Sequence, residues 1–225
     1  MASRYAHRWL TLRRFDSEVR RLTQADLICG ADEVGRGPLA GPLVAAAVCL
    51  PIRARLPGLD DSKNLDPARR AELHERIREV ALGVGWSFVG PRGVDRMNPH
   101  RASLFALRRA VLRVALRVPV AHVLVDGAHR LPDLPLPQDA VVDGDAKSLA
   151  VAAASVVAKC LRDRFMERLA REYPQYGFER HKGYGTAEHL SALAEHGPCP
   201  WHRFSFAPVS NLDLFAAVGA QAEAG

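Results

Sequence analysis

The sequence predicts an α/β protein built on a mixed β-sheet. Two apolar runs, near residues 27–33 and 43–50, are joined by a short loop of glycine and proline, which is typical of a β-hairpin. Further along the chain, strand-like runs alternate with longer amphipathic runs of helical period, as in α/β units. A hairpin followed by α/β units predicts a sheet with both antiparallel and parallel pairs.

The remaining elements follow in order after the hairpin. Pro67 stands at the start of an amphipathic helix near residues 67–82, and Asp66 before it is a suitable N-cap. Beyond it we expect a strand near 85–90, a helix near 99–117, a strand ending at Asp126, a strand near 139–143 and a helix from about Ser148 to Tyr173. The alanines of this last helix predict close packing on the sheet, and we expect Ser155 and Lys159 to take part in packing rather than in substrate contact.

Length and composition predict one compact domain with a small terminal addition. The 225 residues are 48% hydrophobic, which is enough to bury a substantial core. No stretch approaches the roughly 20 apolar residues of a membrane span, and the first residues contain no apolar core of a signal peptide. We therefore expect a soluble, cytoplasmic protein, and we expect it to be a monomer.

The cysteines predict free thiols in a reducing compartment. Cys29, Cys49, Cys160 and Cys199 are scattered without the spacing of paired metal ligands. Cys199 lies between His196 and His202, but this group lacks a fourth ligand and contains two prolines, so a zinc site is disfavoured.

The charge balance favours a polyanionic partner such as a nucleic acid. Lys and Arg outnumber Asp and Glu by 31 to 25, which gives a formal charge of +6. The arginine pairs at 69–70 and 108–109 and the charged run at 162–164 are interpreted as solvated helix faces, without individual roles.

The most informative residues are Asp32 and Glu33, which follow the first apolar run. Adjacent carboxylates at the end of a buried strand need compensation by a cation or by hydrogen-bond donors. Ordinary turn chemistry is the alternative, because Asp and Gly are common in turns. The following Gly35-Arg36-Gly37 segment is neither a Walker loop, which needs Gly-Lys-Ser or Gly-Lys-Thr, nor a dinucleotide fingerprint, because Pro38 comes next.

Two further strand-like runs also end in acidic residues. One ends at Asp126 before Gly127, and the other leads to Asp143 and Asp145. Each acid alone could be a solvated loop residue, but ligands of α/β sheets bind where several strand ends converge. Carboxylate oxygens suit Mg²⁺ or Mn²⁺, and two such ions about 3.5–4 Å apart can hydrolyse a phosphodiester.

One geometric condition accompanies this hypothesis. Successive strand residues point to opposite faces, so Asp32 and Glu33 cannot both face one site along a regular strand. We therefore expect the strand to end or bulge at Glu33, with Gly35 absorbing the turn.

Several motifs, in order and with compatible spacing over residues 27–209, closely resemble those of bacterial ribonuclease HII. They are Asp32-Glu33-Val34-Gly35-Arg36-Gly37-Pro38, Asp61-Ser62-Lys63-x-Leu65, Val125-Asp126-Gly127, Gly144-Asp145-Ala146-Lys147-Ser148, Ala153-Ala154-Ser155-x-x-Ala158-Lys159, Tyr173-Pro174-Gln175-Tyr176-Gly177-Phe178, His181-Lys182-Gly183-Tyr184-Gly185-Thr186 and Ser205-Phe206-Ala207-Pro208-Val209.

The resemblance implies a ribonuclease H-like fold, a five-stranded mixed sheet flanked by helices with a small helical C-terminal extension. On this basis residues 26–172 would form the catalytic core and 173–210 the C-terminal helical extension of the same domain. Residues 1–25 would be a polar N-terminal segment and 211–225 a flexible tail, in which residues 214–218 could form a short helical turn.

The resemblance also implies an activity. Members of the family are endoribonucleases that hydrolyse the RNA strand of RNA–DNA hybrids and cut on the 5′ side of ribonucleotides embedded in duplex DNA. They use two Mg²⁺ or Mn²⁺ ions and leave 3′-hydroxyl and 5′-phosphate ends, in ribonucleotide removal from DNA and in RNA primer removal. Asp32, Glu33, Asp126 and Asp145 match the four metal-binding, catalytic acids.

Substrate-binding residues are implied in the same way. The backbone of Gly35, Arg36 and Gly37 matches the loop that reads the ribose 2′-hydroxyl. Tyr184 matches a tyrosine that stacks on the deoxyribose after the ribonucleotide. Arg36, Lys63 and Lys182 are candidate phosphate contacts, although both lysines could equally be ordinary exposed loop residues.

Some features depart from the family pattern or leave it open. Asp143 stands where many members of the family carry a lysine, and it is either an outer-shell acid or a solvent-facing one. The tail from Asn211 to Gly225 has no clear clamp-binding motif, so no protein partner is predicted.

Three alternative functions remain at this point. A silent hybrid-binding module would have lost at least one of the acids, and a small-molecule phosphohydrolase would not need a sugar-reading loop. A nuclease that acts mainly on long RNA tracts is the more realistic alternative. The sequence does not set the ratio between this activity and incision at a single embedded ribonucleotide.

Overall fold

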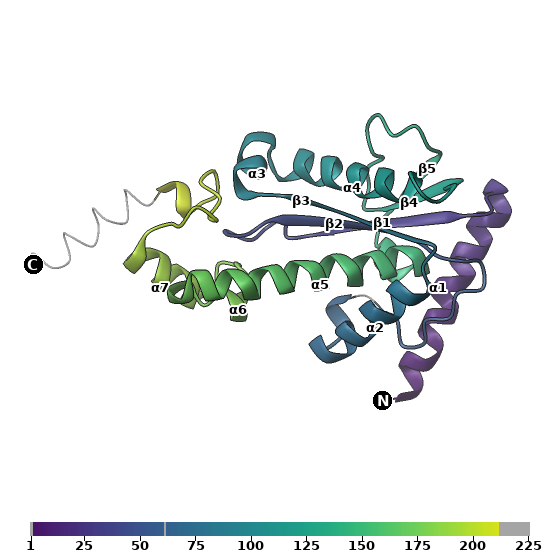
Figure 1. Cartoon of the computed structure of the whole chain (residues 1–225), viewed down its shortest axis with the longest axis horizontal. Helices are drawn as coiled ribbons and strands as arrows, with labels where there is room; N and C mark the ends of the chain where they lie inside the picture. Colours follow the sequence, from purple (N-terminus) through teal and green to yellow (C-terminus); the bar gives the residue numbers. More distant parts are fainter. Residues whose placement is uncertain (1, 61, 212–225) are drawn as a thin grey trace, which may run out of the picture. The chain divides into compact units, whose positions relative to one another are not determined.

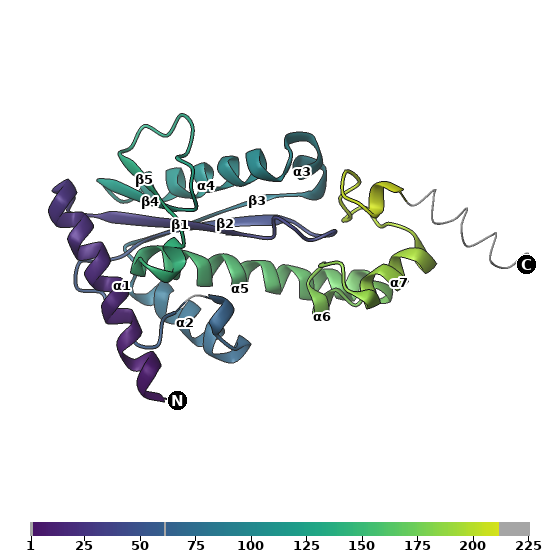
Figure 2. The same ribbon diagram turned by 180° about the vertical axis from the view of Figure 1, so that it is seen from behind.

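A computed structural model describes residues 2–60 and 62–211, with the side chains from residue 8 onward. Its contacts divide the chain into two compact units. The sheet unit comprises Met1–Val34, Val44–Phe88 and Ser103–Leu161, and the C-terminal unit comprises Gly35–Leu43, Val89–Ala102 and Arg162–Gly225, each as far as its residues are described. Figures 1 and 2 show the helices and strands from opposite sides, coloured along the chain.

The described chain contains the predicted mixed sheet of five strands, in the order β3-β2-β1-β4-β5. β1 pairs antiparallel with β2 and parallel with β4, and β4 pairs parallel with β5. The strands are β1 (Ile28–Val34), β2 (Leu43–Cys49), β3 (Gly83–Val89), β4 (His122–Asp126) and β5 (Gln138–Val141). The predicted hairpin is confirmed, whereas the last strand ends at Val141, before Asp143.

The helices also agree with the sequence prediction in most places. They are α1 (Ala2–Thr23), α2 (Pro67–Val80), α3 (Pro91–Met97), α4 (Pro99–Ala115), α5 (Leu149–Glu172), α6 (Phe178–His181) and α7 (Ala187–His196). Asp66 caps α2 as predicted, because its side chain accepts a hydrogen bond from the Arg69 N–H. Two helices were not predicted: α3, and α1 in the polar N-terminal segment.

In the sheet unit, α4 covers one face of the sheet, and α2 and α5 cover the other (Figure 1). Close packing requires glycine at both interfaces. A Cβ on Gly30 of β1 would lie 2.2 Å from the backbone carbon of Ala150 in α5, and one on Gly85 of β3 would lie 2.2 Å from the Ala110 oxygen in α4. The alanines of α5 are buried with Leu12 of α1 and with apolar residues of β2 and α2, so the predicted packing role of this helix is confirmed.

An N-terminal helix that sequence analysis left outside the family match contributes to this packing. Asp16 of α1 is buried, and its carboxylate accepts hydrogen bonds from the Ser148 hydroxyl and the Ala150 N–H. It therefore satisfies donors at the start of α5. Burial raises the pKa of Asp16 from 3.8 to about 6, despite these hydrogen bonds.

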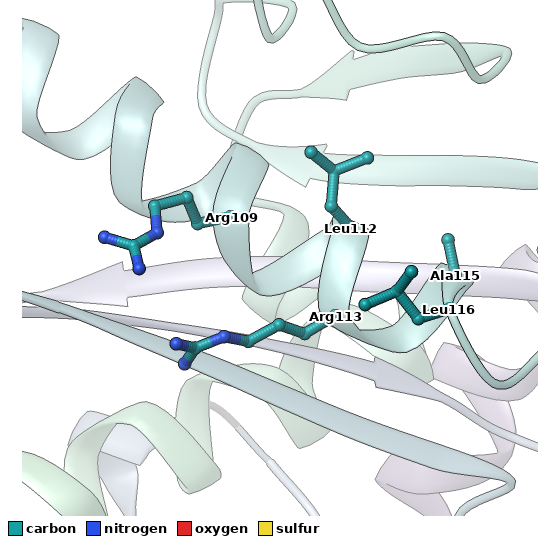
Figure 3. Close-up of a pocket in the computed structure, with 5 residues that line it drawn as sticks. All are labelled: Arg109, Leu112, Arg113, Ala115 and Leu116. Atoms are coloured by element: carbon teal, nitrogen blue, oxygen red, sulfur yellow. The ribbon is translucent and has the colours of Figure 1, made fainter.

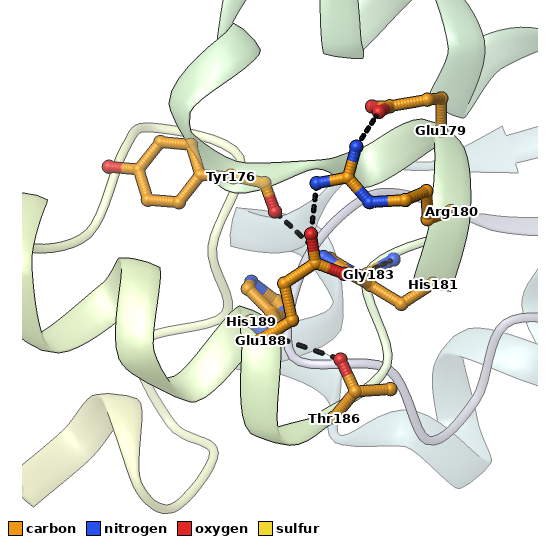
Figure 4. Close-up of polar contacts among 8 residues, drawn as sticks. All are labelled: Tyr176, Glu179, Arg180, His181, Gly183, Thr186, Glu188 and His189. Atoms are coloured by element: carbon orange, nitrogen blue, oxygen red, sulfur yellow. Dashed lines mark hydrogen bonds and ion pairs between the residues drawn. The ribbon is translucent and has the colours of Figure 1, made fainter.

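The C-terminal unit has a core of its own, in which Met166, Leu169, Tyr176 and Phe178 are buried. Figure 4 shows polar contacts of this unit: Arg180 lies between the carboxylates of Glu179 and Glu188, and His181 contacts the Tyr176 carbonyl. The predicted tail turn at residues 214–218 lies outside the described residues.

The helices and the cysteines of the described chain complete the fold. Within residues 2–60 and 62–211, no helix is long and apolar enough to cross a membrane. All four cysteines are free and buried, as the sequence predicted.

Candidate active site

Three of the four predicted acids come together in the sheet unit because neighbouring chain segments end there. Asp32 lies on β1, and Asp126 is the last residue of β4, the parallel neighbour of β1. Asp145 lies in the short 3₁₀ helix η2 (Gly144–Ala146). The Gly144 N–H donates to Asp126 Oδ1 over 2.7 Å, and this bond holds the η2 turn beside the end of β4.

Like Asp145, Asp32 is deeply buried, with 6% of its surface exposed. Burial, followed by the negative charges of Asp126 and Glu33, raises its pKa well above the ordinary value. A hydrogen bond from the Ser155 hydroxyl acts in the opposite direction and lowers the pKa. Ser155 Oγ in turn lies 2.9 Å from Ser62 Oγ, so two serines support this carboxylate.

The other carboxylates also repel one another electrostatically. Burial and the charge of Asp145 raise the pKa of Asp126, while N–H donors of Gly144 and Asp145 and the charge of Lys63 lower it. Lys63 lies 3.2 Å from Asp145 Oδ2, and 79% of its side chain is exposed. This lysine therefore offsets charge at the site from a solvent-facing position, and screening by water makes its contribution small.

The expected irregularity at Glu33 is absent from β1, so that prediction is wrong. Glu33 pairs with Ala45 in the same antiparallel register that joins Asp32 to Ala46, and the strand continues to Val34. Antiparallel pairing with β2 keeps the strand regular, and the side chains of Asp32 and Glu33 therefore leave it on opposite faces. Gly35 does absorb the turn, as predicted, with φ of +90°.

The donor set fits a hard divalent cation. Carboxylate oxygens are the ligands that Mg²⁺ and Mn²⁺ prefer. Burial, and after it the charge of neighbouring carboxylates, raises the pKa of Asp32 and Asp126, so loss of the proton is costly there. A divalent ion at this place would offset that repulsion. Among the described residues, however, no group of three or more His, Cys, Asp or Glu side chains forms a ready metal centre.

Two open questions about other candidate ligands are answered by the fold. Asp143 is exposed, with φ of +54°, so it faces solvent rather than supporting the acids. His202 accepts a hydrogen bond from the Cys199 N–H and contacts His189, which gives both imidazoles structural partners. Burial and then the charge of His189 lower the pKa of His202 to about 4, so the imidazole is neutral near pH 7.

A pocket elsewhere in the sheet unit is distinct from the acids. It has a volume of ≈ 420 Å³ and lies on α4, where Arg109, Leu112, Arg113, Ala115 and Leu116 line it (Figure 3). None of these lining residues is acidic, so the pocket offers no carboxylate for metal-dependent chemistry.

The predicted substrate-binding residues of the C-terminal unit lie on two connected segments. Arg36 and Gly37 are exposed in the loop after β1, and Tyr184 is 44% exposed. The Leu39 N–H donates to the Gly183 carbonyl over 2.8 Å, which ties the loop to the segment that carries Tyr184. Lys182 pairs with Glu167 over 2.9 Å, and only 17% of its side chain is exposed, so it is not the ordinary exposed lysine of the alternative reading.

The interpretation of the charged run 162–164 as a solvated helix face is wrong for Arg162. Its side chain is fully buried and donates to the carbonyls of Pro42 and Ala40. Arg70 is also buried, and it donates to the carbonyls of Ser62 and Leu65. Neither set of contacts can be predicted from the sequence pattern, because the partners are backbone carbonyls, which every residue has.

Comparison with known proteins identifies the family. Residues 29–209 match the sequence profile described as Ribonuclease HII. The chain belongs to the ribonuclease HII family. It is therefore a ribonuclease H-type hydrolase, an endoribonuclease that acts on RNA–DNA hybrids, and metal dependence is general among ribonucleases of this family.

Individual relatives agree with this assignment. The ribonuclease HII of Pelotomaculum thermopropionicum is 54% identical over 82% of this chain and 69% of its own length. That of Geobacillus kaustophilus is 50% identical over 91% of this chain and 77% of its own length.

Solved structures of ribonucleases H have the same fold. The ribonuclease H2 of Pyrococcus horikoshii aligns with a TM-score of 0.69 and 25% identity, over 84% of this chain and 99% of its own. The ribonuclease HII of Archaeoglobus fulgidus, solved in a complex with PCNA, aligns with a TM-score of 0.68 and 31% identity, over 82% and 96%. The ribonuclease H-like fold predicted for this ribonuclease HII chain is confirmed.

Proposed function

We propose that this ribonuclease HII chain cuts by two-metal-ion catalysis and that Asp32, Asp126 and Asp145 hold the two ions, Mg²⁺ or Mn²⁺. Glu33 would complete the ligand set from the end of β1: the regular strand directs its side chain away from that of Asp32, but its charge still acts on Asp32 and raises the pKa of that carboxyl. The observation that carries the proposal is the grouping of Asp32, Asp126 and Asp145, in which burial and then the neighbouring negative charges raise the pKa of Asp32 and Asp126. Such a cluster costs folding free energy, and a bound cation offsets the cost.

Each side chain has a part in this scheme. Asp32, oriented by the Ser155 hydroxyl, and Asp126, fixed by the Gly144 N–H, offer their remaining carboxylate oxygens as ligands. Asp145 offers a further oxygen beside the ammonium group of Lys63. Two divalent ions, when bound, activate water and stabilise charge on the leaving oxygen of the phosphodiester. The products are a 3′-hydroxyl and a 5′-phosphate.

We further propose that the enzyme incises 5′ to ribonucleotides embedded in duplex DNA, for ribonucleotide removal and RNA primer removal. Backbone N–H groups of the Gly35-Arg36-Gly37 loop would read the 2′-hydroxyl, which distinguishes RNA from DNA. The exposed ring of Tyr184 is available for stacking on the following deoxyribose. We propose that the enzyme acts as a monomer.

Phosphate contacts are assigned to Arg36, Lys63 and Lys182. Arg36 is exposed, and its guanidinium can reach a phosphate directly. Lys63 and Lys182 already contact Asp145 and Glu167, so a phosphate would have to share or replace these carboxylates.

The test is incision of a DNA duplex that carries one ribonucleotide, in Mg²⁺ or Mn²⁺ and in chelator, by the intact protein, Asp126→Asn and Tyr184→Ala. We expect metal-dependent cutting 5′ to the ribonucleotide, loss of cutting in Asp126→Asn, and weaker preference for the RNA-to-DNA junction in Tyr184→Ala. Tight duplex binding without cutting in either metal would refute the catalytic proposal. Cutting of uniform hybrids alone would favour a nuclease of long RNA tracts.

A further inference from the structure

Two buried arginines of the C-terminal unit surround the loop that follows β1. Arg162 on α5 and Arg203 are both 0% exposed. Arg203 donates to the carbonyls of Gly35, Arg36 and Gly41, at 2.6, 2.8 and 3.0 Å. Arg162 donates to the carbonyl of Pro42 at 3.0 Å and to that of Ala40 at 3.2 Å.

This arrangement determines which way the loop's peptide groups point. In a trans peptide, the carbonyl of one residue and the N–H of the next point in opposite directions. Because Arg203 binds the carbonyls of Gly35 and Arg36, the N–H groups of Arg36 and Gly37 point away from the guanidinium. These are N–H groups of the loop proposed to read the ribose.

Arg162 also contacts the second segment proposed to bind substrate. Its guanidinium carbon lies 5.8 Å from the centroid of the Tyr184 ring, within the range of a cation–π contact. Gly35 leaves space for this arginine, because a Cβ there would lie 2.3 Å from Arg162 Nε. One side chain therefore packs against both the loop and the stacking tyrosine.

Burying two like charges costs folding free energy. A purely structural role for the two arginines gives no reason for this cost. Burial and then the charge of Arg162 lower the pKa of Arg203 to about 10, and burial lowers the pKa of Arg162. Arg162 Nη1 is buried without a hydrogen-bond partner among the described residues. Asp95 acts against this cost: it raises the pKa of Arg203 and accepts bonds from the N–H groups of Phe204 and Ser205.

We propose that Arg162 and Arg203 are positioning residues for substrate choice: they fix the loop's N–H groups and the Tyr184 ring in the arrangement that selects a ribonucleotide. The inference rests on the proposed function, in which these groups contact the sugar and its neighbour. Arg203 governs the reading of the 2′-hydroxyl, and Arg162 governs both this reading and the junction preference.

The test uses conservative variants and competing substrates. Arg203→Lys and Arg162→Lys keep the positive charge but lose the planar fork that reaches several carbonyls. Arg171→Lys is the matched control, because Arg171 is exposed on the same helix. Two substrates are cut in one reaction, so the ratio of their kcat/KM values does not depend on how much of the variant is active.

We expect the ratio for a ribonucleotide against a 2′-fluoro nucleotide to fall about tenfold in Arg203→Lys, which corresponds to ~1.4 kcal/mol. In Arg162→Lys, the ratio for an embedded ribonucleotide against a uniform RNA–DNA hybrid should fall as well. Arg171→Lys should change neither ratio. Equal slowing on all substrates, with unchanged ratios, would mean that both arginines only stabilise the fold and would overturn the proposal.

Two further observations separate this inference from the proposed function. If the intact protein does not distinguish the ribonucleotide from the 2′-fluoro nucleotide, the proposed sugar reading itself fails. If the variants do not fold, NMR of the intact protein provides the test. The amide signals of Arg36 and Gly37 should shift on addition of a ribonucleotide-containing duplex and not of an all-DNA duplex, and equal shifts with both would refute the reading of the 2′-hydroxyl on which the inference rests.

Discussion

The two units of this molecule bury opposite charges and solve the resulting problem in different ways. The sheet unit gathers Asp32, Asp126 and Asp145, where burial and then repulsion between the carboxylates raise the pKa of Asp32 and Asp126. The C-terminal unit buries Arg162 and Arg203, and these donate to backbone carbonyls. The acids have oxygens left that could bind a cation in place of a proton, whereas the Arg203 guanidinium already donates to three carbonyls and the Arg162 guanidinium to two. The acids of the sheet unit are therefore arranged to bind a cation, and the arginines of the C-terminal unit are arranged to hold a loop rigid.

The largest effect is expected from removing a charge of the acid group. Asp32→Asn should lower kcat/KM at least about 100-fold, because loss of a metal ligand costs several kcal/mol of transition-state stabilisation. The same change should raise the melting temperature in chelator at pH 7–8. A carboxyl whose pKa is raised by folding stabilises the protein below its unfolded pKa and loses this contribution as pH rises.

Melting curves of both proteins in chelator between pH 4 and 8 measure this second effect. The advantage of the variant should grow with pH. A melting temperature at pH 8 that is lower for Asp32→Asn than for the intact protein would mean that the Asp32 carboxylate is stabilised by its protein neighbours without metal. That result would contradict the proposed difference between the buried acids and the buried arginines.

A buried acid outside the site sharpens the comparison. The pKa of Asp16 is about 6 in the folded protein and 3.8 as its ordinary value, so its stabilising contribution is present below about pH 4 and lost through pH 6. The intact protein should lose up to about 3 kcal/mol relative to Asp16→Asn between pH 4 and 7. Denaturant unfolding at both pH values measures this difference, with the exposed Asp26→Asn as control. A parallel pH dependence in both variants would contradict it.

The arginine-held loop should be sensitive to a single methyl group. Gly35→Ala places a Cβ against Arg162 at a φ of +90°, and we expect a loss of about 2 kcal/mol in the free energy of unfolding. At Gly37, a Cβ would meet no atom within 4 Å, so Gly37→Ala should change stability by less than about 0.5 kcal/mol. Comparable losses in chemical denaturation of the two variants would show that the loop is not held as described.

The smallest effect is expected from a serine that supports the acids. Ser155→Ala removes a hydrogen bond to Asp32, and we expect about a tenfold higher divalent-ion concentration for half-maximal activity. Ser87→Ala is the matched control, because Ser87 Oγ is buried without a hydrogen-bond partner in the described chain. Metal titrations of activity compare the two. An unchanged metal requirement in Ser155→Ala would assign this serine to packing alone.

Sequence analysis predicted the parts of the site that depend on local pattern. The apolar runs before Asp32 and Asp126 marked strands, and parallel strands bring their ends to one edge of the sheet. The predicted break at Glu33 failed because pairing with β2 keeps β1 regular as far as Val34. The alternation of side chains between the two faces of a strand follows from local backbone geometry. Whether a bulge or a strand end interrupts it depends on the pairing with the neighbouring strand.

The sequence by itself determined the α/β class, the hairpin and the strand-end acids, because alternation, glycine and helix caps act over a few residues. Only the tertiary structure decided that Ser155 supports Asp32 and that Arg162 and Arg203 are buried against carbonyls of the loop. The Arg162 bond to Pro42 spans 120 residues of sequence. Backbone carbonyls are the same in every residue. Which carbonyl an arginine meets therefore depends on how the chain packs and cannot be predicted from the local residue pattern.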